Sequence, residues 1–182
     1  ALDLAKQGVK VALISSGDSG IYGMAGLALE LWLNERLDSR PLFEVHPGIS
    51  SFQMAAAKLG APFMHDFCSI SLSDLLTPWN QIEKRIKSAA IGDFVLAIFN
   101  PKSIKRDWQL KKTVDLLLEC RNPSTPVAIA RQLGRPEESI EIHTLETLPF
   151  DRVDMLTILV IGNSQSVIKN NKFLTPRGYF SN

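Results

Sequence analysis

Residues 9–23 are the stretch that most limits what this chain can fold into. Residues 9–15 form a mostly apolar run with one charge, which is typical of a central parallel strand that is covered on both faces. Small residues at 17–20 then predict a turn, and apolar residues recur at helical spacing as far as about Arg36. A strand that runs through a glycine turn into a helix indicates an α/β fold.

This turn is also a candidate ligand site. Ligands of open α/β sheets bind beyond the carboxyl ends of the strands, where helix N-termini offer free N–H groups. Asp18 is the only ionisable residue in the turn, and its carboxylate can accept two hydrogen bonds from a ribose diol. The alternative is that Asp18 caps the helix that starts near Ile21. The spacing of the glycines differs from that of the dinucleotide fingerprint, and the sequence contains no P-loop.

A second unit of the same kind follows directly. Residues 43–46 predict a short strand, Pro47-Gly48 a turn, and Ser50 an N-cap for a helix over residues 51–59. Two consecutive strand ends are therefore expected to present small-residue loops followed by helix N-termini. Such loops suit carboxylates, phosphates or hydroxyl-rich ligands.

The pattern resets near residue 64, so we place a domain boundary there. We expect an N-terminal α/β domain over residues 1–64 and a C-terminal α/β domain with a mixed sheet over residues 65–182. In the second domain, Thr77-Pro78 and Gly92 mark the start and the end of a helix. Apolar or alternating runs predict its strands over residues 68–72, 94–99, 126–130, 140–144 and 155–161.

The two ends of the chain also carry signals. Residues 1–8 look like the last turns of a helix, and the sequence has no initiator methionine. Because a helix end that leads into a strand implies an earlier element of the fold, we interpret the sequence as a fragment that lacks an N-terminal strand. Residues 170–179 are rich in turn-forming residues, and we expect them to be loosely held.

Two loops of the second domain follow predicted strands, one at residues 100–102 and one at residues 130–133. If they face the loops of the first domain, a ligand lies in a cleft between the domains. Basic residues gather in and beside these loops, which indicates either a solvated face or a site for an anionic small molecule. Their position at strand ends favours the second interpretation; they are Lys102, Lys105, Arg106, Arg131 and Arg135.

Several classes of function are excluded or disfavoured. The histidines at 46, 65 and 143 fit no zinc spacing, and no arrangement of a nucleophilic triad is recognisable, so we expect no protein-bound metal and no covalent mechanism. A net charge of +1 argues against attraction of the whole protein to nucleic acid. We expect no membrane association, since no apolar run approaches the roughly 18 residues needed to span a bilayer. Without a signal peptide or a disulfide pattern, a cytoplasmic location is expected.

Six segments, in this order, resemble the S-adenosylmethionine-dependent tetrapyrrole methylases of cobalamin and sirohaem synthesis. The resemblance covers essentially the whole chain, and the segments at 99–103 and 175–179 are most similar to the subgroup that methylates C-17 of a precorrin. The segments are Ser16-Gly-Asp-Ser-Gly-Ile-Tyr-Gly23, Val45-His-Pro-Gly-Ile-Ser-Ser51, Phe99-Asn-Pro-Lys-Ser103, Ile129-Ala-Arg-Gln-Leu-Gly-Arg135, Val153-Asp-Met-Leu-Thr157 and Thr175-Pro-Arg-Gly-Tyr179.

The resemblance implies a two-domain α/β enzyme, usually a homodimer, that folds S-adenosylmethionine into the interdomain cleft and takes a tetrapyrrole substrate. Lys102, Arg106 and Arg131 are expected to pair with substrate carboxylates. The family's usual Gly-Asp-Pro reads Gly-Asp-Ser at 17–19, and its N-terminal strand and glycine/proline substrate loop have no counterpart. Matched by position, the residues expected to contact the cofactor are Ser16, Gly17, Asp18, Ile21, Ser50, Ser51, Asn100, Leu133 and Thr157.

The implied reaction is methylation of precorrin-3B at C-17, with ring contraction to precorrin-4 in the same enzyme. Ring contraction requires proton movement, so a general acid or base is expected, although the sequence does not identify it. One alternative is a sibling enzyme that methylates cobalt-factor III in the anaerobic route. The other is a non-catalytic fragment that still binds the cofactor or a tetrapyrrole.

Overall fold

The computed structural model describes residues 1–179, and the chain divides into a smaller unit, Ala1–Ser51, and a larger unit that begins at Phe52. This division lies earlier than the boundary predicted after residue 64. The reason is packing, because α3 (Ser51–Leu59) and β1 (Gly60–Ala61) both belong with the larger unit. Ala55 and Leu59 of α3 lie in a buried cluster with side chains of the larger sheet, and β1 pairs with a strand near the end of the chain.

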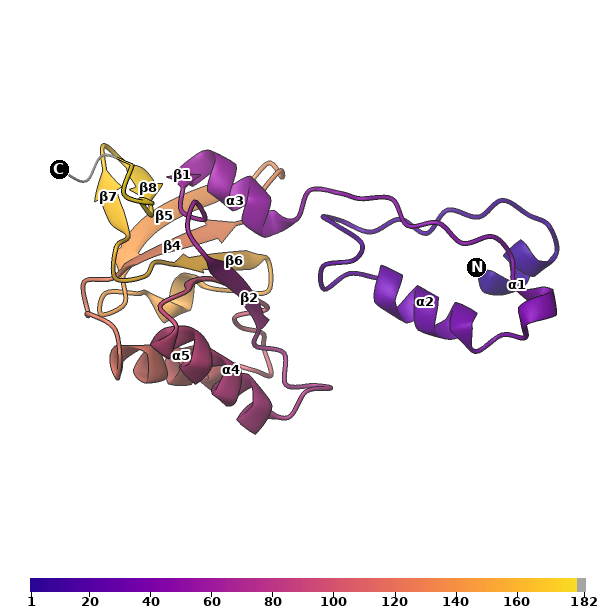
Figure 1. The fold of residues 1–182 in the computed structure, drawn as a ribbon, viewed down its shortest axis with the longest axis horizontal. Helices are drawn as coiled ribbons and strands as arrows, with labels where there is room; N and C mark the ends of the chain where they lie inside the picture. The colour runs from indigo at the N-terminus through magenta and orange to yellow at the C-terminus, as the bar shows by residue number, and fades with distance from the viewer. Residues whose placement is uncertain (180–182) are drawn as a thin grey trace. The chain divides into compact units, whose positions relative to one another are not determined.

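The larger unit is built on a five-stranded mixed sheet (Figure 1). Its first two strands run parallel to each other, and each of the remaining three is antiparallel to its neighbours. This confirms the predicted α/β class. In spatial order the strands are β2 (Phe67–Ser71), β3 (Val95–Phe99), β6 (Thr157–Ile161), β4 (Pro126–Arg131) and β5 (Ser139–Thr144).

Helices cover both faces of this sheet (Figure 1). On one face lie α4 (Trp79–Ile91) and α5 (Trp108–Leu118), whose apolar stripes pack on alternate residues of the strands. On the other face, α3 packs with the remaining residues of the strands and with Phe173. Because successive side chains of a strand point to opposite faces, the nearly continuous apolar strands supply both clusters.

A small second sheet completes the larger unit. It has the order β1, β8 (Lys172–Leu174), β7 (Val167–Lys169), and β7 and β8 form a hairpin. Asn170 and Asn171 make the turn with φ values of +49° and +57°, as two-residue hairpin turns require. The prediction that residues 170–179 are loosely held is therefore wrong for the hairpin, since Phe173 is fully buried.

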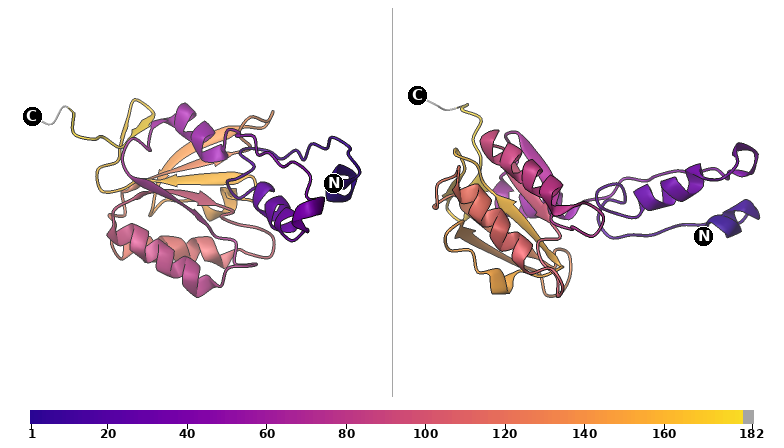
Figure 2. Two further views of the ribbon diagram at one scale, coloured as in Figure 1. Left: turned by 45° about the vertical axis from the view of Figure 1, so that its right-hand side comes forward. Right: turned by 90° about the horizontal axis from the view of Figure 1, so that it is seen from below.

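The smaller unit contains helices α1 (Leu2–Lys6) and α2 (Ala25–Leu33) and a short 3₁₀ turn, η1 (Leu37–Ser39). The strands predicted at residues 9–15 and 43–46 are wrong: both segments are extended but unpaired within residues 1–51, all of which the structure describes (Figure 2). An extended segment becomes a strand only when a neighbour supplies hydrogen bonds. Within the described residues, no helix is long and apolar enough to cross a membrane.

Candidate functional site

Asp18 joins the two glycine loops of the smaller unit. Its Oδ1 accepts a hydrogen bond from the Gly20 N–H at 2.8 Å, and its Oδ2 accepts one from the Gly48 N–H at 2.9 Å. The bonds from Gly48 and Gly20 hold the pKa of Asp18 below its usual range, so the carboxylate is ionised at neutral pH. The helix-cap alternative does not hold, because α2 begins at Ala25 and has no side-chain cap.

The two loops touch backbone to backbone. A Cβ atom added to Gly48 would lie 2.1 Å from the carbonyl oxygen of Gly17, which is far too close for any side chain. Gly17 itself has a φ of +74°, in the left-handed region that glycine tolerates. The Ser19 hydroxyl also donates to the carbonyl of His46 at 3.4 Å. The loops therefore present bare backbone beside one ionised carboxylate.

The other predicted residues of the smaller unit lie in or next to these loops. Ser16 is exposed and Ile21 is half-buried. Ser50 is buried at 2% exposure, and Ser51 is the first residue of α3. The two predicted loops thus come together within this unit, although the strands expected to support them do not form.

In the larger unit the register brings the remaining predicted residues to one end of the five-stranded sheet. Ser71 at the end of β2 pairs with Phe99 at the end of β3, and Arg131 at the end of β4 pairs with Thr157 at the start of β6. Because β6 is antiparallel to both β3 and β4, its first residue lies beside their carboxyl ends. The remaining predicted residues lie at the strand ends or in the loops that follow them: Asn100, Lys102, Arg106, Arg131, Leu133 and Thr157.

The loop after β3 is pinned to its surroundings by its own polar side chains. The Asn100 amide donates to the Ser71 hydroxyl at 3.0 Å, and Asn100 has a φ of +49°. Arg106 Nη1 donates to the carbonyls of Leu72 and Asn100, each at 3.0 Å, and Lys102 Nζ donates to the carbonyl of Phe150 at 3.0 Å. These bonds hold the loop in place, and none of their acceptors is a carboxylate.

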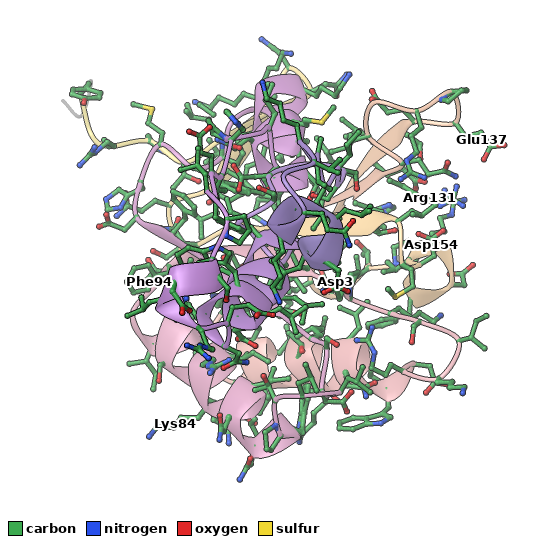
Figure 3. The ribbon with its side chains drawn as sticks, turned by 90° about the vertical axis from the view of Figure 1, so that its right-hand side faces the viewer. Asp3, Lys84, Phe94, Arg131, Glu137 and Asp154 are labelled. Atoms are coloured by element: carbon green, nitrogen blue, oxygen red, sulfur yellow. The ribbon has the colours of Figure 1, made fainter. Side chains whose placement is uncertain are left out.

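The three predicted substrate-binding cations therefore differ in charge environment. Among residues 1–179, neither Lys102 nor Arg106 forms an ion pair with a carboxylate, so their charges stay available to an anionic ligand. Arg131 is different, because its Nε donates to Asp154 Oδ2 at 2.7 Å (Figure 3). Asp154 thus lies beside a predicted site residue, and the sequence analysis did not name it, although the segment 153–157 contains it.

One hollow of the larger unit lies away from these residues. A hollow of about 650 Å³ opens beside β5 and β7 and is lined by residues such as Ile142, His143 and Lys169, none of them a predicted site residue. No group of three His, Cys, Asp or Glu side chains able to hold a metal ion is present in the described part of the chain. The candidate site therefore rests on the strand-end loops.

Known proteins provide an independent comparison. The profile of the family described as Tetrapyrrole (Corrin/Porphyrin) Methylases matches residues 1–149. A probable cobalt-factor III C(17)-methyltransferase of Salmonella typhimurium is 47% identical over 98% of this chain and 73% of its own length. A precorrin-3B C(17)-methyltransferase of Sinorhizobium is 38% identical over the same shares of the two chains. A cobalt-factor III methyltransferase of Priestia megaterium is 45% identical, and this chain spans 34% of its length.

Solved structures show the same fold. The methyltransferase CobJ superposes with a TM-score of 0.91 at 35% identity, over 96% of this chain and 73% of CobJ. A uroporphyrin-III C-methyl transferase from Thermus thermophilus, solved in complex with S-adenyl homocysteine, gives a TM-score of 0.54 at 20% identity, over 80% of this chain and 62% of that one. At this lower identity the likeness concerns the fold alone.

Proposed function

The chain belongs to the tetrapyrrole (corrin/porphyrin) methylase family, and on this basis we propose that it is an S-adenosylmethionine-dependent C-17-methyltransferase of cobalamin biosynthesis. One observation carries the proposal: relatives that are 38–47% identical over 98% of this chain are named for methylation at C(17). The ring contraction that accompanies this methylation is part of the same proposal.

The residues present fit S-adenosylmethionine. In the smaller unit, Gly17 and Gly48 are exposed and have no side chain to cover their backbone groups, and Asp18 supplies a carboxylate suited to hydroxyl or ammonium groups. In the larger unit, Asn100, Leu133 and Thr157 offer neutral polar and backbone groups at one end of the sheet. We assign these residues, together with Ser16, Ile21, Ser50 and Ser51, to cofactor binding. When bound, the cofactor supplies an electrophilic methyl group.

The protein's main contribution is alignment, because the electron-rich macrocycle is itself the carbon nucleophile. Holding two reactants in the correct geometry contributes about 7–11 kcal/mol to lowering the barrier. The pinned loop after β3 suits this role, since Lys102 and Arg106 present unpaired charges from an ordered backbone. We assign these two cations to substrate carboxylates, and Arg131 to the same role only where a substrate carboxylate displaces Asp154.

Two substrates are candidates, precorrin-3B and its cobalt-containing counterpart, cobalt-factor III. Relatives named for each substrate cover 98% of this chain, at 40–47% identity for cobalt-factor III and 38% for precorrin-3B, so the proposal includes both. A homodimer is a further expectation of the proposal, and light scattering of the purified protein tests it.

Turnover of the two substrates by the full protein tests the proposal. Each is incubated with S-adenosylmethionine, and kcat/KM is compared for the unaltered protein, Lys102→Ala and Arg106→Ala. We expect a preference for one substrate and a loss of about tenfold or more in each variant, as for the removal of a charge-assisted contact. Wild-type rates in both variants would show that Lys102 and Arg106 do not bind the substrate and are ordinary solvated side chains.

A further inference from the structure

One carboxylate holds the turn that precedes β6. Asp154 Oδ1 accepts hydrogen bonds from the Leu156 N–H and from the Thr157 hydroxyl, each at 2.9 Å. The Thr157 hydroxyl in turn accepts the Asp154 N–H at 3.1 Å. Thr157 is only 5% exposed, and its hydroxyl is therefore committed to the turn rather than to a ligand.

The second oxygen of this carboxylate reaches a different loop. Asp154 Oδ2 accepts the Arg131 Nε–H at 2.7 Å, and Figure 3 shows the two labelled side chains next to each other at the end of the sheet. A backbone bond from the Gln132 N–H to the Leu156 carbonyl, at 2.9 Å, joins the same two segments. Gln132 has a φ of +51°, which side-chain-bearing residues seldom adopt. The loop thus depends on its neighbours for its conformation.

We propose that Asp154 is a positioning residue for cofactor binding. It sets the backbone of Thr157 directly, through the turn. It sets the backbone of Leu133 indirectly, through Arg131 and through Leu156, whose carbonyl receives the loop's N–H. The inference rests on the proposed function, since that function makes Leu133 and Thr157 cofactor contacts.

The surroundings of Asp154 favour its ionised form. Burial raises the pKa of Asp154, but hydrogen bonds from Arg131, Thr157 and Leu156 outweigh this effect and leave the pKa below its usual value. Asp154 is therefore ionised at neutral pH, and the guanidinium of Arg131 finds its counter-charge within the protein. A carboxylate that joins two loops in this way acts on both at once, which a purely local turn cap does not.

The test measures the affinity of the full protein for S-adenosylhomocysteine by calorimetry, alongside its Tm. Asp154→Ala removes both links, and we expect the Kd to rise about tenfold, as for outer partners of binding groups. Thr157→Val breaks the turn and is expected to have a similar effect, whereas Thr157→Ser keeps the hydroxyl and stays within about twofold of the parent. The double variant Asp154→Ala/Thr157→Val is expected to have a Kd no higher than that of the more strongly affected single variant, because both substitutions disrupt the same turn.

Glu141→Gln is the matched control, because Glu141 Oε2 accepts from Arg152 Nη1 at 2.6 Å in an ion pair of the same kind on β5. It is expected to leave the affinity unchanged. An unchanged Kd in Asp154→Ala, or an equal loss of affinity in Glu141→Gln, would overturn the role of Asp154 as a positioning residue but not the proposed function. Failure of the unaltered protein to bind S-adenosylhomocysteine would overturn the proposed function as well. If Asp154→Ala does not fold, equal affinities of Thr157→Val and Thr157→Ser would refute the proposal.

Discussion

The apolar runs at residues 9–15 and 94–99 have similar sequences but different surroundings. In the larger unit, Val95 and Ile98 of β3 are fully buried between helices, and β3 is paired with two neighbouring strands. In the smaller unit, Leu13 is 53% exposed and Ile14 is 88% exposed, and no strand pairs with them within residues 1–51. A pattern of apolar residues therefore specifies a preference for extended backbone, whereas hydrogen bonds to a neighbouring strand decide whether a strand forms.

The candidate site is less sensitive to this difference than the cores are. In each unit an aspartate joins two chain segments: Asp18 bonds to Gly20 and Gly48, and Asp154 bonds to Leu156 and to Arg131. These bonds are polar, and they form in a unit without a buried apolar core as well as in one with it. Loop geometry and core packing are therefore separate properties of this chain.

The largest effect should come from the core of the larger unit. Leu117→Ala removes a fully buried side chain of α5, and we expect a loss of about 2–5 kcal/mol in the free energy of unfolding. Leu31→Ala removes a side chain of α2 that is 54% exposed, and we expect a change within about 0.5 kcal/mol. Urea titration of both variants measures the contrast. A large loss for Leu31→Ala would show that α2 is covered in solution.

Asp18→Ala should next separate binding from folding. The variant removes the acceptor of two backbone bonds and the carboxylate assigned to the cofactor, so the Kd for S-adenosylhomocysteine should rise about tenfold or more. The free energy of unfolding should change little, because the smaller unit has no apolar core to disturb. Asp38→Ala is the matched control, since it removes an exposed carboxylate of the same unit that pairs with Arg36. Equal affinities of the two variants would remove Asp18 from the site.

Two glycine substitutions also separate cofactor binding from folding within the smaller unit. Gly48→Ala would place a Cβ 2.1 Å from the Gly17 carbonyl, so the loops must move apart and the affinity for S-adenosylhomocysteine should fall several-fold. Gly26→Ala, in α2, meets nothing within 4 Å and should stabilise the helix by about 0.4–1 kcal/mol without changing the affinity. Calorimetry measures the affinity of both variants, and thermal unfolding measures their stability. An unaltered affinity in Gly48→Ala would contradict the contact between the loops.

The smallest expected effect is the pH dependence of the Arg131–Asp154 pair. Because the pKa of Asp154 is lowered in the folded state, the pair stabilises the protein fully above the ordinary carboxyl pKa. This contribution is lost as pH falls below about 4, through the lowered pKa. It is worth less than about 1 kcal/mol, since the two side chains are 36% and 40% exposed. In Asp154→Asn, the midpoint of urea unfolding should depend less on pH in this range. An unchanged dependence would show that the pair contributes nothing to stability.

Much of the larger unit could be predicted from the sequence, because its signals are local. Thr77-Pro78 and Gly92 bracket α4 correctly, and the apolar runs at 94–99 and 126–130 are β3 and β4. The hairpin of β7 and β8 was missed, since two adjacent asparagines signal a turn but do not reveal that β8 pairs with β1. The strands predicted in the smaller unit were wrong, because a strand needs a neighbouring strand, and the local sequence pattern does not show whether one is present.

The site was predicted in a similarly uneven way. Glycine spacing and the lone acid pointed to the loops around Asp18 and Gly48, which the structure brings into contact. The sequence could not show that Arg131 is already paired or that Asp154 joins two loops, because both facts depend on the antiparallel register of β4 and β6. Charge counted along a chain does not reveal which charges are compensated in space.

Transfer of an isotopically labelled methyl group tests the central claim most directly. The full protein is incubated with methyl-labelled S-adenosylmethionine and either precorrin-3B or cobalt-factor III, and the mass of the macrocycle is measured. We expect a product heavier by one labelled methyl group, carried at C-17, with S-adenosylhomocysteine formed in equal amount. An unlabelled macrocycle with both substrates, under conditions in which the protein binds S-adenosylhomocysteine, would contradict the claim that this chain is a C-17-methyltransferase.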